Sequence, residues 1–124
     1  MSKYKNKKTE VNGILFDSKK EATYYLHLLD MYHRGEISGF MMQVPYELIP
    51  AVYKDEVKHL KTKDKTVRKC IQKAAHYIAD FVYVDKDGKT HVIDVKSFIT
   101  RKNPVYTLKK KMMLAFKGIA IEEI

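Results

Sequence analysis

Several features that define common protein classes are scarce or missing in this sequence. The chain has no tryptophan, three prolines, five glycines and one cysteine, Cys70. A single cysteine excludes an internal disulfide and is typical of a reducing compartment, so we expect a cytoplasmic location. No apolar run approaches the roughly 20 residues that span a membrane. Residues 1–8 are polar and basic and lack the apolar segment of a secretory signal. These absences exclude a disulfide-stapled miniprotein and a membrane protein.

The chain does have a large excess of positive charge. Its 124 residues contain 24 Lys and Arg against 15 Asp and Glu, a net charge of +9. This length predicts a single domain over residues 1–124. The excess is concentrated in residues 1–8 and 54–73, and the second stretch holds eight cations against three acids. Such a balance indicates a polyanionic partner, with nucleic acid favoured over a membrane. The alternative is a solubilising tail and a solvated loop.

The first half of the chain predicts a hairpin, a helix and extended chain. Asn12-Gly13 lies between β-forming residues, which is a strong signal for a tight hairpin. Ser18 followed by Glu21 is a capping box, which predicts the start of a helix. Gly35 is expected to end that helix. Residues 37–49 are typical of extended structure, in one bent strand or two short ones.

The middle of the chain divides into a basic part and an apolar part. Residues 54–75 are expected to form a basic insertion or loop, with a short helix over 67–75 as an open alternative. Residues 76–84 and 90–97 are rich in β-branched and aromatic side chains. They therefore predict two strands joined by a short turn.

A second helix and a final strand complete the predicted fold. Pro104 suits the first turn of a helix, and Gly118 suits its end. The apolar face of this helix is expected to consist of Val105, Leu108, Met112 and Phe116. A short strand over 119–121 follows. The fold class is α/β, with one central sheet.

Two aspartates and a lysine interrupt the otherwise apolar hairpin strands. Charged residues within buried strands are unfavourable unless they are paired or bound to metal. A three-residue loop at 86–88 places Gly88 where the turn needs a left-handed residue. In that register Asp80 faces Asp94, and Lys96 follows on the same face, opposite Ile78. A two-residue loop would instead place the two acids on opposite faces. The turn chemistry therefore favours the register that brings the carboxylates together.

Two opposed carboxylates have Cβ atoms only about 4.5–5.5 Å apart, and both ionise unfavourably without a cation. Mg²⁺ or Mn²⁺ takes oxygen ligands and would remove that repulsion. We therefore predict Asp80, Asp94 and the backbone carbonyl of Val95 as ligands. Lys96 is expected to orient the attacking water or accept its proton. The alternative is a carboxylate–lysine salt bridge on a half-exposed hairpin. Glu21 is a further candidate ligand, and helix capping alone would also explain its presence.

These elements resemble the PD-(D/E)XK nuclease superfamily and, more closely, small phage-encoded endonuclease-like proteins. The similarity covers nearly the whole chain, and residues 54–73 match least. One departure is Ala79, which precedes Asp80 where the superfamily pattern has proline. The matching segments are Lys7–Val11, Phe16–Ala22, Tyr77–Phe81 and Asp94–Lys96.

The resemblance implies an αβββαβ core like that of restriction endonucleases, with helices flanking a mixed sheet and a β-hairpin at the N-terminus. It implies a phage or prophage DNA endonuclease in a bacterial host that uses Mg²⁺ or Mn²⁺ to hydrolyse phosphodiester bonds. The implied catalytic residues are Glu21, Asp80, Asp94 and Lys96. Glu21 joins Asp80, Asp94 and Val95 as an implied metal ligand. By analogy with Holliday-junction resolvases, we expect a branched DNA substrate and a homodimer.

The sequence also offers candidate DNA contacts and rival functions. Gln43 lies on the extended segment after the first helix, either near the site or simply as an edge or outward-facing side chain. A non-catalytic nucleic-acid-binding module and a basic protein-interaction subunit remain as alternative functions. The predicted DNA contacts are Lys61, Lys63, Lys65, Arg68, Lys69, Lys109 and Lys110.

Overall fold

The structure, a computed structural model, describes residues 8–97 and 99–124. Lys3, Lys5 and Lys7, which belong to the basic N-terminal segment, lie outside the described residues. It confirms the mixed α/β class. No helix within the described ranges is long and apolar enough to cross a membrane. The elements in chain order are β1 (Thr9–Val11), β2 (Ile14–Phe16), α1 (Lys19–His33), β3 (Phe40–Ile49), β4 (Val52–His59), β5 (Asp64–Gln72), β6 (Ala75–Val84), β7 (Thr90–Asp94), the short 3₁₀ helix η1 (Thr100–Lys102), α2 (Pro104–Lys117) and β8 (Glu122–Glu123).

The central sheet has four strands in the order β3-β6-β7-β8. Pairing is antiparallel from β3 to β7 and parallel between β7 and β8, so the sheet is mixed. Phe81 and Ile93 pack in one core cluster with α1 and the end of β2. Their neighbours Val82 and Val92 pack in a second cluster with α2. Because successive residues of a strand point to opposite faces, the two helices cover opposite faces of the sheet.

The predicted N-terminal hairpin and the first helix are confirmed. β1 pairs with β2 around the turn at Asn12-Gly13. Ser18 caps α1, and its hydroxyl accepts a 3.1 Å hydrogen bond from the backbone N–H of Glu21. The rings of Phe16 and Tyr25 lie 5.0 Å apart and pack the hairpin on the helix.

The turn between β6 and β7 has the predicted three-residue loop. Gly88 adopts φ = +82°, and the N–H of Asp85 donates to the carbonyl of Lys89 over 2.9 Å. The strands pair from Val84 with Thr90 to Phe81 with Ile93. That register places Asp80 and Asp94 at the next position along the two strands, immediately beyond the last paired residues.

The ribbon formed by β3 and β6 changes faces halfway along its length. Phe81 packs on the α1 side, whereas Ala79, two residues earlier on β6, packs on the α2 side. The same change occurs on β3 between Met42 and Val44. Gln43 lies between these two residues with φ = +53°, opposite Asp80. A left-handed residue inside a strand reorients the backbone, so the ribbon turns about its axis at Asp80.

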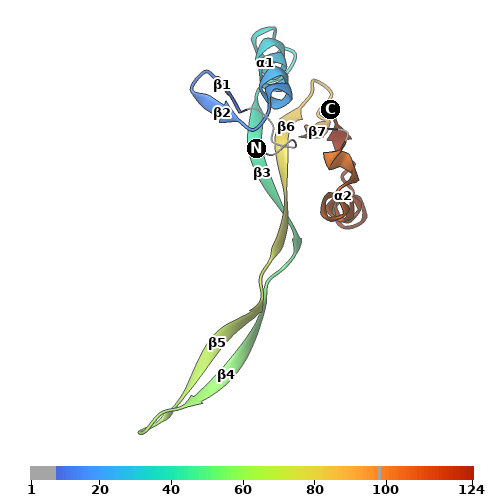
Figure 1. The fold of residues 1–124 in the computed structure, drawn as a ribbon. Helices are drawn as coiled ribbons and strands as arrows, with labels where there is room; N and C mark the ends of the chain where they lie inside the picture. Colours follow the sequence, from blue (N-terminus) through green and yellow to red (C-terminus); the bar gives the residue numbers. More distant parts are fainter. Residues whose placement is uncertain (1–7, 98) are drawn as a thin grey trace.

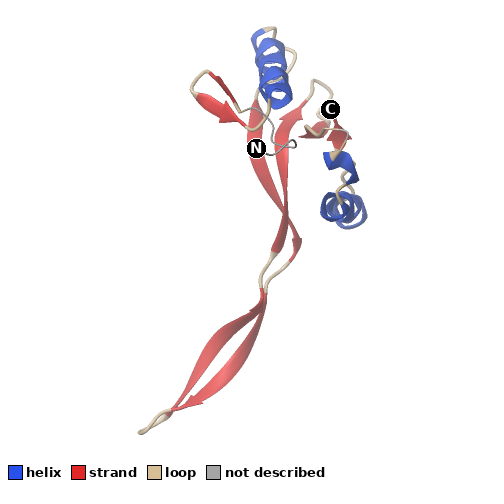
Figure 2. Ribbon diagram, in the orientation of Figure 1, coloured by secondary structure: helices blue, strands red, loops and turns tan. Residues whose placement is uncertain are grey.

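The expected basic loop at 54–75 is wrong, and so is the alternative helix over 67–75. This segment forms most of a long two-stranded arm, β4 paired with β5, that extends away from both helices (Figures 1 and 2). Nearly every residue of the arm is exposed, and only Val67 is partly covered. Since neither face is buried, the sequence lacks the alternation of apolar and polar residues that identifies a strand.

The second helix begins at Pro104 and ends before Gly118 as predicted, but its buried face was predicted wrongly. Tyr106 and Met113 are the buried residues of α2. Met112 of the predicted apolar face is partly buried against the core. The other three predicted residues are exposed, at 63% for Val105, 59% for Leu108 and 65% for Phe116. Apolar residues occur on more than one side of α2, so spacing alone does not identify the side that packs.

We predict that Gly88→Ala lowers the free energy of unfolding by about 1–2 kcal/mol, because an L-residue is strained at positive φ. Gly88→Asn should recover part of the loss, since asparagine is one of the non-glycine residues that adopt positive φ most readily. Gly39→Ala is the matched control, because Gly39 lacks a positive φ and has open space around it. Urea denaturation measures all three variants. Equal losses for Gly39→Ala and Gly88→Ala would contradict the role of the turn.

Candidate functional site

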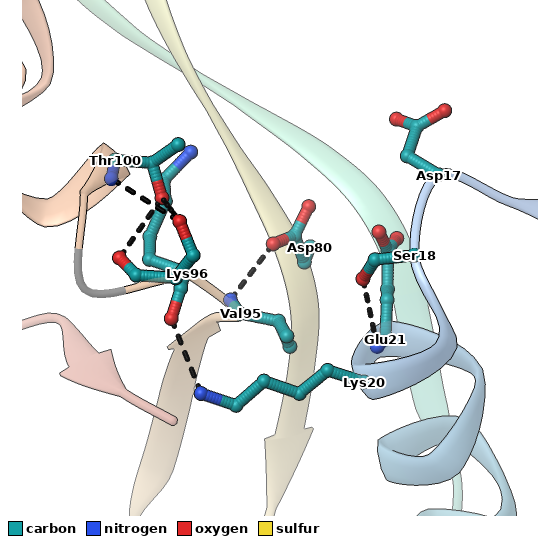
Figure 3. Close-up of a pocket in the computed structure, with 9 residues that line it drawn as sticks. Asp17, Ser18, Lys20, Glu21, Asp80, Val95, Lys96 and Thr100 are labelled. Atoms are coloured by element: carbon teal, nitrogen blue, oxygen red, sulfur yellow. Dashed lines mark hydrogen bonds between the residues drawn. The ribbon is translucent and has the colours of Figure 1, made fainter. Parts of the chain in front are cut away.

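A pocket of about 250 Å³ lies where the start of α1 approaches β6 and the segment after β7 (Figure 3). A second pocket, of about 380 Å³, lies on the α2 side of the sheet. Asp80 and Glu21 line the first pocket, and Asp94 lines the second. Lys96 and Thr100 line both, so the two pockets adjoin. All four predicted catalytic residues therefore lie in one region, although not on a single face.

Asp80 occupies the point where the ribbon of β3 and β6 turns. Its Oδ2 accepts a 2.8 Å hydrogen bond from the backbone N–H of Val95, as Figure 3 shows. Burial raises the pKa of the Asp80 carboxyl, and the hydrogen bond from Val95 opposes that rise. The charge of the nearby Asp94 raises this pKa further. This effect agrees with the strand register, which places the two aspartates at the next position beyond the last pair, Phe81 with Ile93.

Asp94 is almost fully buried, with 1% of its surface exposed. Its Oδ2 accepts a 2.7 Å hydrogen bond from the hydroxyl of Tyr77. Its Oδ1 has no hydrogen-bond partner among the described residues, and Nζ of Lys96 lies 3.5 Å away. A buried carboxylate oxygen without a hydrogen bond is unfavourable, so it is an available ligand for a cation.

Glu21 is the other buried carboxylate of the described residues, at 7% exposed. Burial raises the pKa of its side chain to about 7, and the charges of Asp80, Asp17 and Asp94 add to the rise. The positive charge of Lys96 lowers the pKa of Glu21. A carboxyl so strongly perturbed inside a pocket is typical of functional sites. The capping role of this position is carried by its backbone N–H, which leaves the carboxylate directed at the pocket.

Gln43, whose role the sequence left open, connects two of the predicted site residues. Its Nε2 donates to Oε1 of Glu21 and to Oδ1 of Asp80, each over 3.4 Å. The positive φ of a non-glycine residue inside a strand costs roughly 1–2 kcal/mol and is found most often at functional sites. Gln43 is exposed on the edge strand β3, as the alternative expected, and its amide also contacts the two site carboxylates. No sequence signal marked this conformation, because glutamine is not a usual left-handed residue.

Lys96 contacts Asp94 but does not occupy the position predicted for it. β7 ends at Asp94, so the expected pairing of Lys96 with Ile78 does not form among the described strands. Nζ of Lys96 lies 4.9 Å from the ring centre of Tyr106, a cation–π contact that attaches it to α2. The carbonyl of Lys96 accepts a hydrogen bond from Nζ of Lys20 over 3.2 Å. Tyr77, Tyr106 and Lys20 were not predicted as site residues.

The candidate ligand atoms at this site are oxygens, the ligand type that Mg²⁺ and Mn²⁺ take. Among the described residues, no group of three or more His, Cys, Asp or Glu side chains is placed to hold a metal ion. Mg²⁺, however, keeps several waters and binds through one or two carboxylates. Asp80, Asp94 and the carbonyl of Val95 could supply that smaller set, and Oδ1 of Asp94 still lacks a hydrogen bond.

The predicted DNA contacts fall into two groups. Five of them belong to the arm or its tip, far along the chain from the pocket: Lys61, Lys63, Lys65, Arg68 and Lys69. Lys109 lines the pocket on the α2 side. Nζ of Lys110 instead forms a 2.6 Å ion pair with Glu123, which ties α2 to β8. Because Glu123 already pairs with this ammonium, the structure adds no support to the predicted contact between Lys110 and DNA.

We predict that Asp80→Asn stabilises the protein in the presence of a chelator. A raised pKa means that ionisation of Asp80 opposes folding, so the penalty is absent at low pH and grows as the pH rises through the folded-state pKa. The variant should gain roughly 1–3 kcal/mol at pH 8 and little at pH 4. Thermal unfolding at both pH values tests this, with Asp87→Asn in the exposed turn as the control. Destabilisation at pH 8 would contradict the inferred repulsion.

The chain was also compared with known proteins. No curated protein and no solved structure matches it. Residues 1–122 match the model of the family described as "Protein of unknown function (DUF1064)". The match includes β1 to β7, α1 and α2, and therefore every residue of the candidate site. The chain belongs to this DUF1064 family.

Proposed function

We propose that this protein is a metal-dependent DNA endonuclease that hydrolyses phosphodiester bonds at the Asp80–Asp94 pair. The observation that carries the proposal is the pair itself. The strand register places the two aspartates side by side at a break in the sheet, and Oδ1 of Asp94 is buried without a hydrogen bond. Among the described residues the cation beside that oxygen is the Lys96 ammonium, at 3.5 Å, so the oxygen keeps a lone pair that a metal ion could take.

The order of elements supports a PD-(D/E)XK-like core. When the β4–β5 arm is set aside, α1 is followed by β3, β6, β7, α2 and β8. That is the order helix, three strands, helix, strand which the resemblance implies. Glu21 comes from the first helix, Asp80 from the second of these strands and Asp94 from the end of the third. Lys96 belongs to the segment directly after that strand. Each acid thus comes from the element that the resemblance assigns to it.

In this proposal Asp80, Asp94 and the carbonyl of Val95 hold Mg²⁺ or Mn²⁺, with Glu21 as an outer ligand. The bound ion supplies Lewis acidity toward a phosphate oxygen and lowers the pKa of a bound water. Lys96 orients the attacking water with an ammonium group that Asp94 and the Tyr106 ring position. Gln43 holds Glu21 and Asp80 at the spacing seen here, since its amide contacts both.

DNA is the substrate that best fits the charge of the chain. A net charge of +9 favours a polyanion, and it predicts binding that weakens steeply as salt is added. Branched DNA and a homodimer extend the proposal by analogy of fold alone. Two nicks on opposite strands would require two such sites, which is the reason to expect a dimer.

The test is incubation with linear, nicked, forked and four-way DNA, with Mg²⁺, with Mn²⁺ and with a chelator. We expect strand cleavage only with a divalent ion, and a loss of roughly 1,000-fold or more in rate for Asp94→Asn. DNA affinity measured in chelator should change little in this variant. Asp87→Asn, an exposed position in the turn of the same hairpin, is the matched control and should cleave like the unmodified chain.

The outcomes separate the rival functions. DNA binding without cleavage under any metal condition would favour a non-catalytic nucleic-acid-binding module. No affinity for DNA even at low salt would favour a basic protein-interaction subunit. Cleavage by Asp94→Asn at the rate of the unmodified chain would eliminate the proposed site while leaving open a nuclease that works elsewhere on the molecule.

A further inference from the structure

The two faces of the β4–β5 arm differ sharply in charge. Directly opposed residues share a face, so the strand register sorts the side chains. One face carries three opposed pairs: Lys54 with Lys69, Glu56 with Val67, and Lys58 with Lys65. Its formal charge is therefore +3. We call this the lysine face.

The other face is nearly neutral and satisfies its own charges. Its opposed pairs are Tyr53 with Cys70, Asp55 with Arg68, Val57 with Thr66, and His59 with Asp64. Nδ1 of His59 lies 2.9 Å from Oδ1 of Asp64, and the guanidinium of Arg68 stacks 4.0 Å above the ring of Tyr53. With neutral histidine its formal charge is −1. The positive charge of the paired strands is therefore concentrated on one side.

The lysine face is unfavourable for the arm taken alone. Like charges directly opposite each other across antiparallel strands destabilise the pair. Here this occurs twice, at Lys54 with Lys69 and at Lys58 with Lys65, and Glu56 offers one weak contact to Lys69 at 3.9 Å. An isolated two-stranded hairpin is only marginally stable in water. A partner with closely spaced negative charges would relieve this repulsion.

The position of the arm indicates an extended partner. Lys69 precedes Asp80 by eleven residues along a nearly continuous ribbon, which spans at most about 37 Å. Because the arm extends away from both helices (Figure 1), an elongated molecule such as a polymer is suited to reach both the lysine face and the pocket. The lysine pairs lie four residues apart, about 14 Å, which is the axial length of roughly four base pairs of DNA. The major groove of DNA also admits a two-stranded β-ribbon.

We propose that the lysine face, through Lys54, Lys58, Lys65 and Lys69, binds the phosphate backbone of double-stranded DNA. The identity of the partner rests on the proposed function, whereas the contact itself does not depend on hydrolysis. The arm then supplies affinity without sequence preference, because phosphate contacts position a protein on DNA but do not read bases. The opposite face of the arm takes no part in this contact.

The test is equilibrium binding of the full chain to a 30-base-pair duplex in chelator, between 50 and 200 mM salt. The variant carries Lys→Gln at all four positions, which removes charge but keeps side-chain length. Each lost phosphate contact reduces the salt slope by about 0.9. We expect a slope smaller by about 3 to 4, so that the unmodified chain loses roughly 100-fold more affinity over this range than the variant. Two unrelated duplex sequences should give the same shift.

A second variant loses the same number of positive charges elsewhere on the molecule. It tests whether DNA binding depends on the lysine face or only on the net charge of the chain. It carries Lys→Gln at Lys86, Lys89, Lys111 and Lys117, which are exposed and lie outside the arm. Its slope should fall by less than 1. Equal losses in both variants, an unchanged slope in the lysine-face variant, or stronger displacement by poly-glutamate than by duplex of equal charge would overturn the proposal. Because no cleavage is measured, a chain that binds through this face but never cuts DNA would refute only the proposed function.

Discussion

Acidic side chains on opposite faces of a β-sheet can interact only where the sheet is interrupted. In this protein the interruption is at Gln43 and Asp80, where the β3–β6 ribbon turns about its axis. Asp94 lies on the α2 side with Tyr77, and Glu21 lies on the α1 side at the start of the first helix. Asp80 sits at the turn and interacts with both. Without this irregularity, a regular sheet would separate Glu21 from Asp94 by its full thickness.

The arrangement is electrostatically unfavourable for the folded chain without a cation. Glu21 and Asp94 are the buried charged side chains of the described residues, and burial raises the pKa of both Glu21 and Asp80. Local contacts offset part of this penalty. The Gln43 amide donates to the carboxylates of Glu21 and Asp80. The Tyr77 hydroxyl donates to Asp94, and the Lys96 ammonium lies beside it. A site that accepts strain and charge repulsion together is arranged for a ligand, because neither stabilises the fold.

The features that the sequence revealed are those set by local chemistry. Gly88 determines the turn and hence the register, and Ser18 determines where α1 starts, because each acts through neighbouring backbone atoms. The features that it concealed depend on distant contacts. The buried side of α2 is chosen by Tyr106, which reaches Glu123, and the arm shows no periodic pattern because neither of its faces packs on a core. The left-handed Gln43 had no local signal at all.

The junction between the sheet and the arm has its own consequence for function. Ile49 pairs with Ala75 and Val52 with Gln72, but the intervening residues, including Pro50, are outside the ladder. Pro50 has no N–H to donate, and its carbonyl is bound by the side chain of Gln72 over 3.4 Å. Two short unpaired segments joined by one side-chain contact bend more easily than a continuous ladder. If the arm binds DNA as we propose, this junction would let it follow the duplex while the hydrogen bonds from Val95 and Gln43 keep the Asp80 carboxylate in place.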